Sequence, residues 1–237
     1  MTGQTVRPPA YQILADELRA EITSGRLRPG ERLPPEPELG IRTGVSRSTV
    51  REALRLLASQ NLIVTTRGVT GGSFVAHPDT GQLSEALSTG LALLANAAVV
   101  GFMDLLELRR ALEEPAAALA APRRTEEHLA MMREALFDPD KDDLDTILHA
   151  HSAFHSAVAT ATGNPLYELL TRPLYQVSYG EEVLAATPEG YWTRIDADHR
   201  ELLRCITVRD AAGAAAVSRR HIDYITATAI AAASVGP

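Results

Sequence analysis

The segment HAHSAFHSAV, residues 149–158, places three of the chain's seven histidines within seven positions. His151 and His155 are four residues apart, so in a helix their rings share one face, whereas His149 points about 200° away from His151. Two imidazoles on one helical face can bind a divalent transition metal, and they can equally be core side chains with ordinary partners. The pair therefore raises a choice that only residues on other elements can decide.

The composition is that of a globular chain that needs no disulfide bonds to stabilise its core. Its 237 residues are 45% hydrophobic, which is enough for one large domain or two smaller ones. The single cysteine, Cys205, excludes an intrachain disulfide and fits a reducing compartment. There is no secretory signal pattern, and the longest apolar stretch, LALLANAAVVGFM, is too short to span a bilayer. We expect a cytoplasmic protein with no membrane contact.

The net charge of −7 conceals an asymmetry. Residues 1–77 contain ten arginines against seven acidic residues, and the rest contains thirteen basic against twenty-three acidic residues. The N-terminal third can thus meet a polyanion that the remainder of the chain would repel.

The N-terminal third has the pattern of three helices. Apolar residues recur every four positions from residue 14 to residue 22 and predict an amphipathic helix that ends at the Ser-Gly pair 24–25. EPELGIRTG predicts a short second helix stopped by Gly44. Ser46 is a good N-cap for a third helix that runs to about Ser59. LIVTT and SFVA are rich in strand formers and flank RGVTGG, which predicts a β-hairpin.

The remainder is rich in Ala and Leu with helical periodicity. Turn residues interrupt it at Gly101, Pro122, the acidic run DPDKDD, Gly-Asn-Pro 163–165, Thr-Pro 187–188 and Asp210. We predict six or seven helices and no strand after residue 77. The expected fold is mostly α: a winged helix-turn-helix over residues 8–77, a linker over 78–82, and an all-α helical bundle over 83–233.

The third predicted helix has the composition of a DNA-recognition helix. Arg47, Arg51 and Arg55 are spaced by four and face away from the apolar stripe, with Ser48 and Thr49 near the N-terminus. Arginine can bridge guanine O6 and N7, and short hydroxyls reach phosphates. A solvated arginine stripe is the alternative interpretation of the helix alone. Its order with the cap and the hairpin favours DNA binding, with Gly71 and Gly72 letting the wing approach the backbone.

This stretch also resembles a known family. ERLPPEPELGIRTGVSRSTVREALRLLASQNLI, followed by GGSFV, is similar to the DNA-binding domain of GntR-family bacterial transcription regulators. The resemblance implies that Arg47, Thr49 and Arg51 contact a double-stranded operator. Pro35 and Pro37 stand where Ser and Arg are usual, so one expected contact to the DNA backbone near the start of the second helix is missing. Asn61 replaces the usual Gly, and this change is tolerable because Asn also adopts the left-handed conformation.

The C-terminal part resembles the ligand-binding FCD domain of the FadR-like branch. The similar segments are LLELRRALEEPAAALAA, FHSAVATATGNPLYELL and DHRELLRCITVRDAAGAAAVSRRHI. Many members hold a divalent metal on an Asp and three histidines, and the matching positions here are His151, His155, His199 and His221. His151 stands where Asp is usual. Imidazole ligands suit Zn, Ni, Cu or Fe better than Mg or Ca, and we expect Zn²⁺, with Ni²⁺ as the rival. The competing pair Asp145 and His149 does not fit this register.

Two further residues are weighed. Arg109 lies beside the face of its helix that should point inward, where it could clamp a carboxylate or pair with Glu113 four residues on. The resemblance favours the carboxylate clamp as an effector contact. Asn164, in Gly-Asn-Pro, is expected to be a turn residue. His77 and His128 are assigned no role.

These patterns predict a ligand-responsive regulator, by family habit a repressor. We expect a homodimer that reads a palindromic operator and binds a small carboxylate effector at the metal and Arg109. The alternative within the same branch is a metal-free regulator that responds to acyl-CoA. A metal-dependent hydrolase is disfavoured, because the chain has no H-E-x-x-H motif, phosphate loop or nucleophile elbow.

Overall fold

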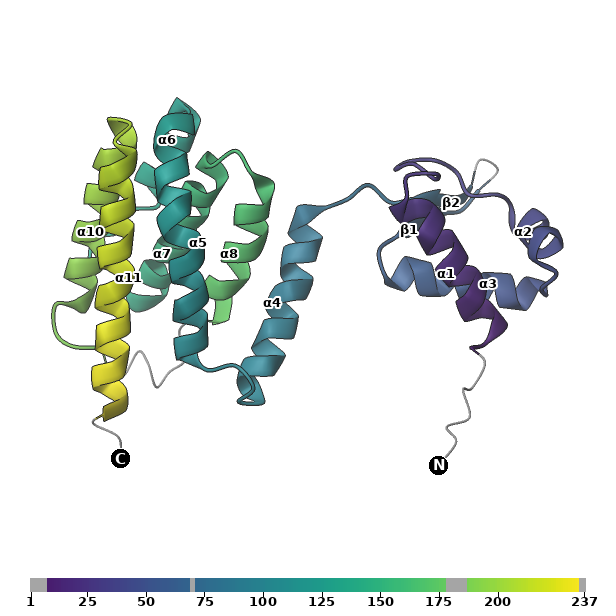
Figure 1. The fold of residues 1–237 in the computed structure, drawn as a ribbon, viewed down its shortest axis with the longest axis horizontal. Coiled ribbons are helices and arrows are strands. Elements are labelled where there is room, and N and C mark those ends of the chain that lie inside the picture. Colours follow the sequence, from purple (N-terminus) through teal and green to yellow (C-terminus); the bar gives the residue numbers. More distant parts are fainter. Residues whose placement is uncertain (1–7, 69–70, 178–186, 235–237) are drawn as a thin grey trace. The chain divides into compact units, whose positions relative to one another are not determined.

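The computed structural model describes residues 8–68, 71–177 and 187–234. The chain divides into two compact units at Asp79 and Thr80 (Figure 1). Helix α4 (Thr80–Asn96) begins inside the predicted linker of residues 78–82, so the last three of those residues are helical. Each unit is described by itself below.

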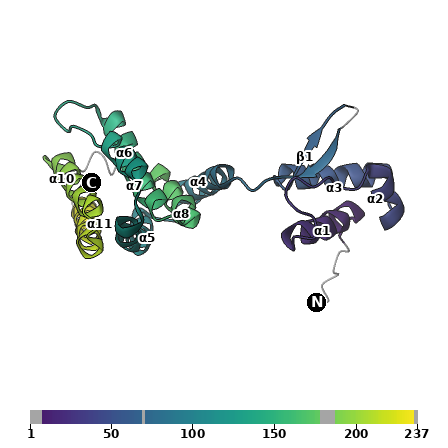
Figure 2. The ribbon, with the colours of Figure 1, turned by 90° about the horizontal axis from the view of Figure 1, so that it is seen from above.

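The first unit contains three helices and one hairpin. Helices α1 (Ala10–Thr23), α2 (Glu36–Thr43) and α3 (Arg47–Ser59) precede strands β1 (Ile63–Thr66) and β2 (Gly72–Val75). The strands pair antiparallel with Ile63 opposite Val75, and Figure 2 shows them extending away from the helices. The predicted winged helix-turn-helix is confirmed. The two residues at the hairpin tip, 69 and 70, lie outside the described residues.

Local signals set the ends of these helices. Gly44 ends α2 in the left-handed conformation, at φ 67°. The Ser46 side chain caps α3 by accepting a hydrogen bond from the backbone N–H of Thr49 at 3.2 Å. Pro35 is the N-cap of α2 and Pro37 lies in its first turn, where a helix does not need their missing N–H groups. Asn61 has φ 57°, as predicted for the position where Gly is usual.

The core of the first unit is one apolar cluster. It combines side chains from α1, α2, α3 and both strands, among them Leu14, Leu18, Leu39, Val50, Leu57, Ile63 and Val75. Helix α3 buries Val50, Ala53, Leu54 and Leu57, and these four residues are its predicted apolar stripe. Helix α3 thus packs against the core with one face and leaves its arginines on the other face, at the surface.

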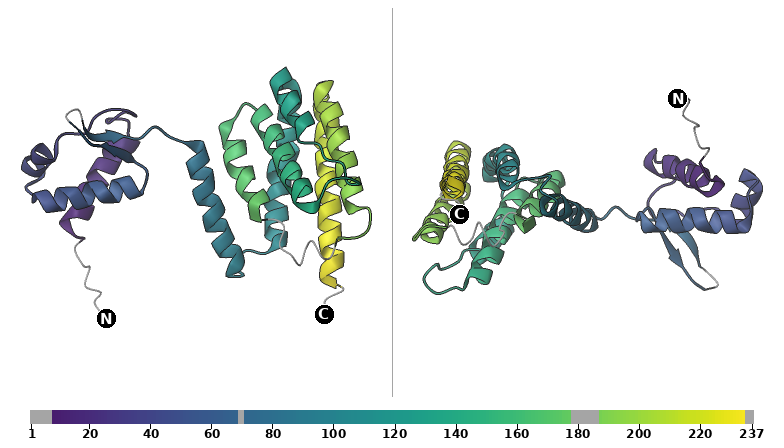
Figure 3. Two further views of the ribbon diagram at one scale, coloured as in Figure 1. Left: turned by 180° about the vertical axis from the view of Figure 1, so that it is seen from behind. Right: turned by 90° about the horizontal axis from the view of Figure 1, so that it is seen from below.

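The second unit is an all-α bundle in the described residues. After α4 come α5 (Phe102–Arg123), α6 (Glu126–Glu134), α7 (Leu144–Ala161), α8 (Pro165–Val177), α10 (Tyr191–Thr207) and α11 (Ala211–Ser234). Helix α5 is central, because it contacts α7, α8, α10 and α11 (Figure 3). Past Val75, no described residue belongs to a strand. None of the described helices is both long and apolar enough to cross a membrane.

The predicted breaks fall at helix ends. Asp143 caps α7 by accepting from the Thr146 N–H, and Asp210 accepts from the Gly213 N–H at the start of α11. The Asn164 side chain accepts from the Leu166 N–H, which confirms its role in the turn before α8. Pro122 lies one residue before the end of α5. These side-chain hydrogen bonds fix where α7, α8 and α11 begin.

Candidate metal centre and nucleic-acid interface

A layer of buried polar side chains crosses the helical unit. On each of α5, α7, α10 and α11 it lies between residues of two apolar clusters, one containing Leu106, Ile147, Ile195 and Ile222 and the other containing Ala117, Phe154, Leu202 and Val217. Its members are Arg109, Glu113, His151, His155, Asp198, His199 and His221, and none of them is more than 5% exposed. Burial of seven such groups costs too much free energy unless they satisfy one another or bind something.

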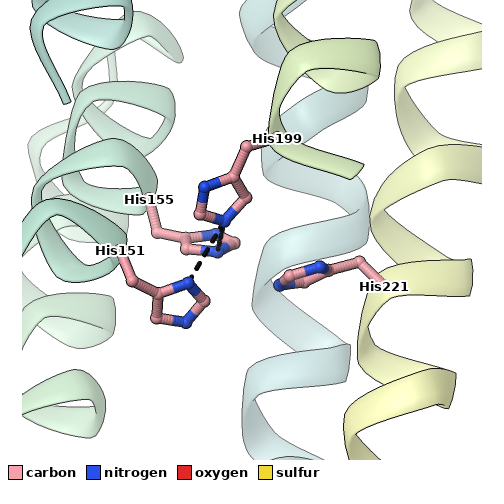
Figure 4. Close-up of side chains that lie close together, drawn as sticks. All are labelled: His151, His155, His199 and His221. Carbon is pink, nitrogen blue, oxygen red and sulfur yellow. Dashed lines mark hydrogen bonds between the residues drawn. The ribbon is translucent and has the colours of Figure 1, made fainter. Parts of the chain in front are cut away.

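The four histidines of this layer converge from three helices. Figure 4 shows His151 and His155 of α7 and His199 of α10 turned toward one another, with His221 of α11 completing the group. Nδ1 of His151 lies 3.1 Å from Nε2 of His199, which in turn lies 3.2 Å from Nε2 of His155. One nitrogen from each of the four rings lies within 4.8 Å of the others. In a tetrahedral zinc site, nitrogens about 2.0–2.1 Å from the ion are about 3.3–3.4 Å apart.

The protonation states fit a metal site. Burial lowers the pKa of His151 and His199 well below the usual value, and the neighbouring imidazoles add to this effect. Burial likewise lowers the pKa of His155, to about 4, although Glu113 favours the charged ring. These three rings are therefore neutral at pH 7, which is the state that binds a metal. His221 is 2% exposed, and neither of its ring nitrogens has a hydrogen-bond partner among the described residues.

His151, which stands where an aspartate is usual, reaches the cluster through its Nδ1 atom. The ring nitrogen that faces His199 is Nδ1, which is bonded directly to Cγ. A carboxylate oxygen of aspartate is also bonded to Cγ, so the two donor atoms lie the same number of bonds from the backbone. A histidine at this position can thus place a donor atom where an aspartate would.

Two carboxylates stand behind the histidines, and the sequence did not identify either as part of the site. Oε2 of Glu113 lies 3.1 Å from Nδ1 of His155, and Oδ2 of Asp198 lies 3.7 Å from Nδ1 of His221. Carboxylates in this place orient a ligating ring and raise its basicity. Asp198 directly precedes His199, and Glu113 was considered only as an ion-pair partner of Arg109.

Both carboxylates are ionised. Burial opposes ionisation of Glu113, but the charge of Arg109 and the contact with His155 outweigh it and lower its pKa. Burial also opposes ionisation of Asp198, whose pKa falls to about 2 through its contact with His221 and the hydrogen bond from Arg220. The layer therefore holds negative charge beside Nδ1 of both His155 and His221. In His155 the other ring nitrogen, Nε2, is the one that faces His199.

Arg109 is fully buried and belongs to the same layer. Its Nε donates to Oε1 of Glu113 at 2.7 Å, so the i, i+4 pair that was the alternative interpretation is present. Its guanidinium also lies 4.3 Å from the centre of the Tyr175 ring, and that ring stacks on His155 at 4.8 Å. The ion pair uses Nε of the guanidinium and keeps Arg109 next to the histidine cluster.

The other histidines lie apart from this cluster. His149 is exposed, and its Nδ1 lies 2.8 Å from the main-chain oxygen of Asp145. The Asp145 side chain is exposed as well, so this pair forms a surface contact. His128 sits in the first turn of α6, where its Nδ1 accepts from the Thr125 N–H. The choice of His151 and His155 over the Asp145–His149 pair agrees with the burial of each.

The arginines of α3 form the other candidate site. Arg47, Ser48 and Arg51 are exposed, while Thr49 is half-buried. The Arg51 Nε donates to Oε2 of Glu36 at 3.0 Å, which ties α3 to the first turn of α2. Ser46 Oγ lies 2.8 Å from the hydroxyls of both Ser48 and Thr49. This surface offers two cations and a group of short hydroxyls at one helix N-terminus, the arrangement that reads DNA in a major groove.

The two wing glycines have a role inside the hairpin. A Cβ at Gly71 would lie 2.6 Å from the main-chain oxygen of Thr66, and one at Gly72 would lie 2.7 Å from Nε of Arg32. Arg32 also donates to the main-chain oxygen of Gly71 at 2.5 Å. The hairpin's own packing thus requires Gly71, independently of any approach to DNA, whereas a Cβ at Gly72 would only displace the Arg32 side chain.

Comparison with known proteins agrees with this geometry. Residues 10–75 match the bacterial regulatory proteins of the gntR family, and residues 104–224 match the FCD domain. An Escherichia coli (strain K12) regulatory protein named for the L-lactate dehydrogenase operon is 29% identical over 224 residues, covering 91% of this chain and 84% of that protein. The HTH-type transcriptional regulator LutR of Bacillus subtilis (strain 168) is 35% identical over 151 residues, 63% of this chain and 66% of its own.

A solved structure extends the likeness to both units. Streptococcus agalactiae GntR has 25% sequence identity and a TM-score of 0.55, covering 92% of this chain and 99% of that one. Its match spans the winged helix-turn-helix and the helical bundle together. The chain therefore belongs to the gntR family of bacterial regulatory proteins with an FCD domain, and it is a ligand-responsive, DNA-binding transcriptional regulator rather than an enzyme.

Proposed function

We propose that the helical unit holds one divalent transition metal on His151, His155, His199 and His221, and that a carboxylate effector binds there with help from Arg109. The observation that carries this proposal is the convergence of four buried ring nitrogens from α7, α10 and α11. Imidazole donors favour Zn²⁺, with Ni²⁺ as the alternative. The bound metal supplies a Lewis-acidic, positively charged point that attracts an anionic ligand.

The charges of the layer explain why the effector should be an anion. The four proposed ligands are neutral, so they do not compensate the metal's charge of +2. Glu113 already balances Arg109, and Asp198 hydrogen-bonds to Arg220 and Arg194. A carboxylate that contacts both the metal and the guanidinium of Arg109 would offset one of the metal's two positive charges. A small organic acid or sugar acid fits this description, and lactate is a sensible first candidate given the name of one relative.

The polar layer does not favour the acyl-CoA alternative. An acyl chain needs an apolar cavity within the bundle. Here the centre of the bundle is occupied by buried charged and imidazole side chains.

The first unit supplies the output of the regulator. We propose that Arg47, Ser48, Thr49 and Arg51 of α3 contact a double-stranded operator, with Gly71 and Gly72 in the wing beside the phosphates. Two copies of the chain would read the halves of a palindrome, because one winged unit offers few base contacts. Effector binding would then change the relative populations of two arrangements of the dimer and reduce operator affinity, which is repression relieved by ligand.

The substitution Arg109→Lys tests the effector site. Lysine keeps a positive charge beside the buried Glu113, so the fold should survive, but it lacks the planar fork that binds a carboxylate through two hydrogen bonds. We expect the effector concentration that half-releases operator DNA to rise at least about tenfold, which corresponds to about 1.4 kcal/mol of lost binding. Fluorescence anisotropy with a selected operator duplex measures this, using a carboxylate found by thermal-shift screening of the zinc-loaded protein. An unchanged half-release concentration would remove Arg109 from the effector site.

The substitution His151→Asp tests the ligand set. Because Nδ1 of His151 and a carboxylate oxygen of Asp lie the same number of bonds from the backbone, we expect the variant to retain a bound metal. His151→Ala, which has no donor atom, should bind zinc at least about tenfold more weakly. The added negative charge of Asp should also weaken the attraction for an anionic effector. Zinc affinities from competition with a chromophoric chelator compare the three proteins, and equal affinities would show that His151 is not a ligand.

A further inference from the structure

We propose that Glu113 is a positioning residue of the metal centre, which fixes the His155 ring and links it to Arg109. This inference rests on the metal site proposed above and adds the group that orients one of its ligands. Glu113 and Arg109 lie on α5, whereas His155 lies on α7, so the link joins two helices.

The two oxygens of Glu113 serve different neighbours. Oε1 accepts the hydrogen bond from Nε of Arg109 at 2.7 Å, and Oε2 lies 3.1 Å from Nδ1 of His155. All three side chains are buried, so water does not compete for these contacts. A carboxylate held at Nδ1 keeps the proton on that nitrogen and leaves the lone pair of Nε2 for a metal. Nε2 of His155 is indeed the nitrogen that faces His199, at 3.2 Å.

Tyr175 closes the arrangement from the other side. Its ring stacks on the His155 ring with centroids 4.8 Å apart, and the Arg109 guanidinium lies 4.3 Å from the same ring. His155 and Arg109 thus share two neighbours, Glu113 and Tyr175. We therefore expect that an effector which displaces Arg109 also shifts the position of the His155 ring. Metal affinity and effector affinity become linked, and by thermodynamic reciprocity each changes the other by the same factor.

The double substitution Arg109→Gln with Glu113→Gln tests this role. Glu113→Gln alone leaves a buried arginine without its counter-charge, which can prevent folding. Replacing both residues removes one charge of each sign, so the net charge near the metal is unchanged. Gln has the shape of Glu at position 113 and is a shorter neutral side chain than Arg at position 109. We expect zinc to bind about 10–100-fold more weakly than to the unmodified chain, because the ring of His155 is no longer oriented by a carboxylate.

A matched control replaces a different ion pair, which includes the neighbour of Glu113 on α5. Arg219 of α11 donates to Glu114 of α5 at the surface of the unit. The Arg219→Gln, Glu114→Gln variant should bind zinc as the unmodified chain does. Cobalt(II) gives a second readout, since its visible absorption bands report the coordination geometry. The bands should change in the Arg109, Glu113 variant and stay the same in the control.

The outcomes separate the inference from the proposed function. If the Arg109, Glu113 variant folds, binds zinc within about threefold of the unmodified affinity and gives the same cobalt spectrum, Glu113 is a structural ion-pair partner only and the inference is wrong, while the metal site stands. If the unmodified chain binds neither zinc nor nickel, the proposed metal site fails and the inference fails with it.

Discussion

Replacing His199 with alanine is expected to lower the metal content of the purified protein from about one ion per chain to near zero. His199 is the best choice among the four proposed ligands, because its Nε2 is the shared neighbour of His151 Nδ1 at 3.1 Å and His155 Nε2 at 3.2 Å. The other nitrogens would be left without the donor that lies between them. The lost ring is also buried against Phe154, on which it stacks at 4.2 Å, so some thermal stability should be lost as well.

The measurement is elemental analysis of protein purified without an affinity tag. Each protein is analysed as isolated and again after incubation with Zn²⁺ or Ni²⁺ followed by desalting. His149→Ala is the matched control, because His149 lies on the same helix as two of the proposed ligands and is exposed. The control should keep its metal. A His199→Ala protein that retains the full metal content, with circular dichroism showing an intact bundle, would contradict the proposed ligand set.

The sequence predicts the elements well where the signal is local. Ser46 caps α3, Gly44 ends α2, and Asn61 takes the left-handed conformation, and each of these depends on a residue's own backbone preference or on a neighbour three positions away. The start of α4 was placed too late, because HPDTG contains turn residues that equally suit the first turn of a helix. Such a boundary depends on contacts between α4 and α8 that the sequence does not display.

The site itself was predictable only in part. His199 and His221 could be chosen because they fall at positions that matter in a similar family, whereas spacing alone offers no reason to pair them with α7. Glu113 and Asp198 are more instructive. In the sequence Glu113 has the spacing of an ordinary surface pair with Arg109, and nothing local reveals that the packing of α5 against α7 buries both residues beside His155.

The largest effect on DNA binding is expected from Arg51→Ala. We predict a loss of operator affinity of at least about tenfold per half-site, together with weaker discrimination at the bases that Arg51 reads, since one good bidentate arginine contact is worth about 1–3 kcal/mol. In a dimer the loss occurs in both half-sites. Fluorescence anisotropy at one fixed salt concentration, with a selected operator and a scrambled duplex, measures both affinity and preference.

Arg55→Ala separates a base contact from a general charge effect. Arg55 lies one turn farther from the N-terminus of α3, is exposed, and like Arg51 is paired with a glutamate, in its case Glu52 at 3.4 Å. Its loss should weaken binding to both duplexes by a similar and smaller factor. If Arg51→Ala behaves in the same way, or keeps full affinity and preference, the assignment of this face of α3 as the reading surface is wrong.

Stability cannot explain the expected loss in Arg51→Ala. The Arg51–Glu36 pair is exposed on both sides, and pairs of this kind contribute at most about 1 kcal/mol to folding. The variant should therefore unfold at nearly the same temperature as the unmodified chain. Glu36 nevertheless holds the guanidinium of Arg51 at 3.0 Å, so in the free protein the side chain has less conformational freedom to lose when it binds DNA. Glu36→Gln removes this partner and keeps the arginine, so we expect it to lose far less operator affinity than Arg51→Ala. The comparison assigns the loss to the arginine itself.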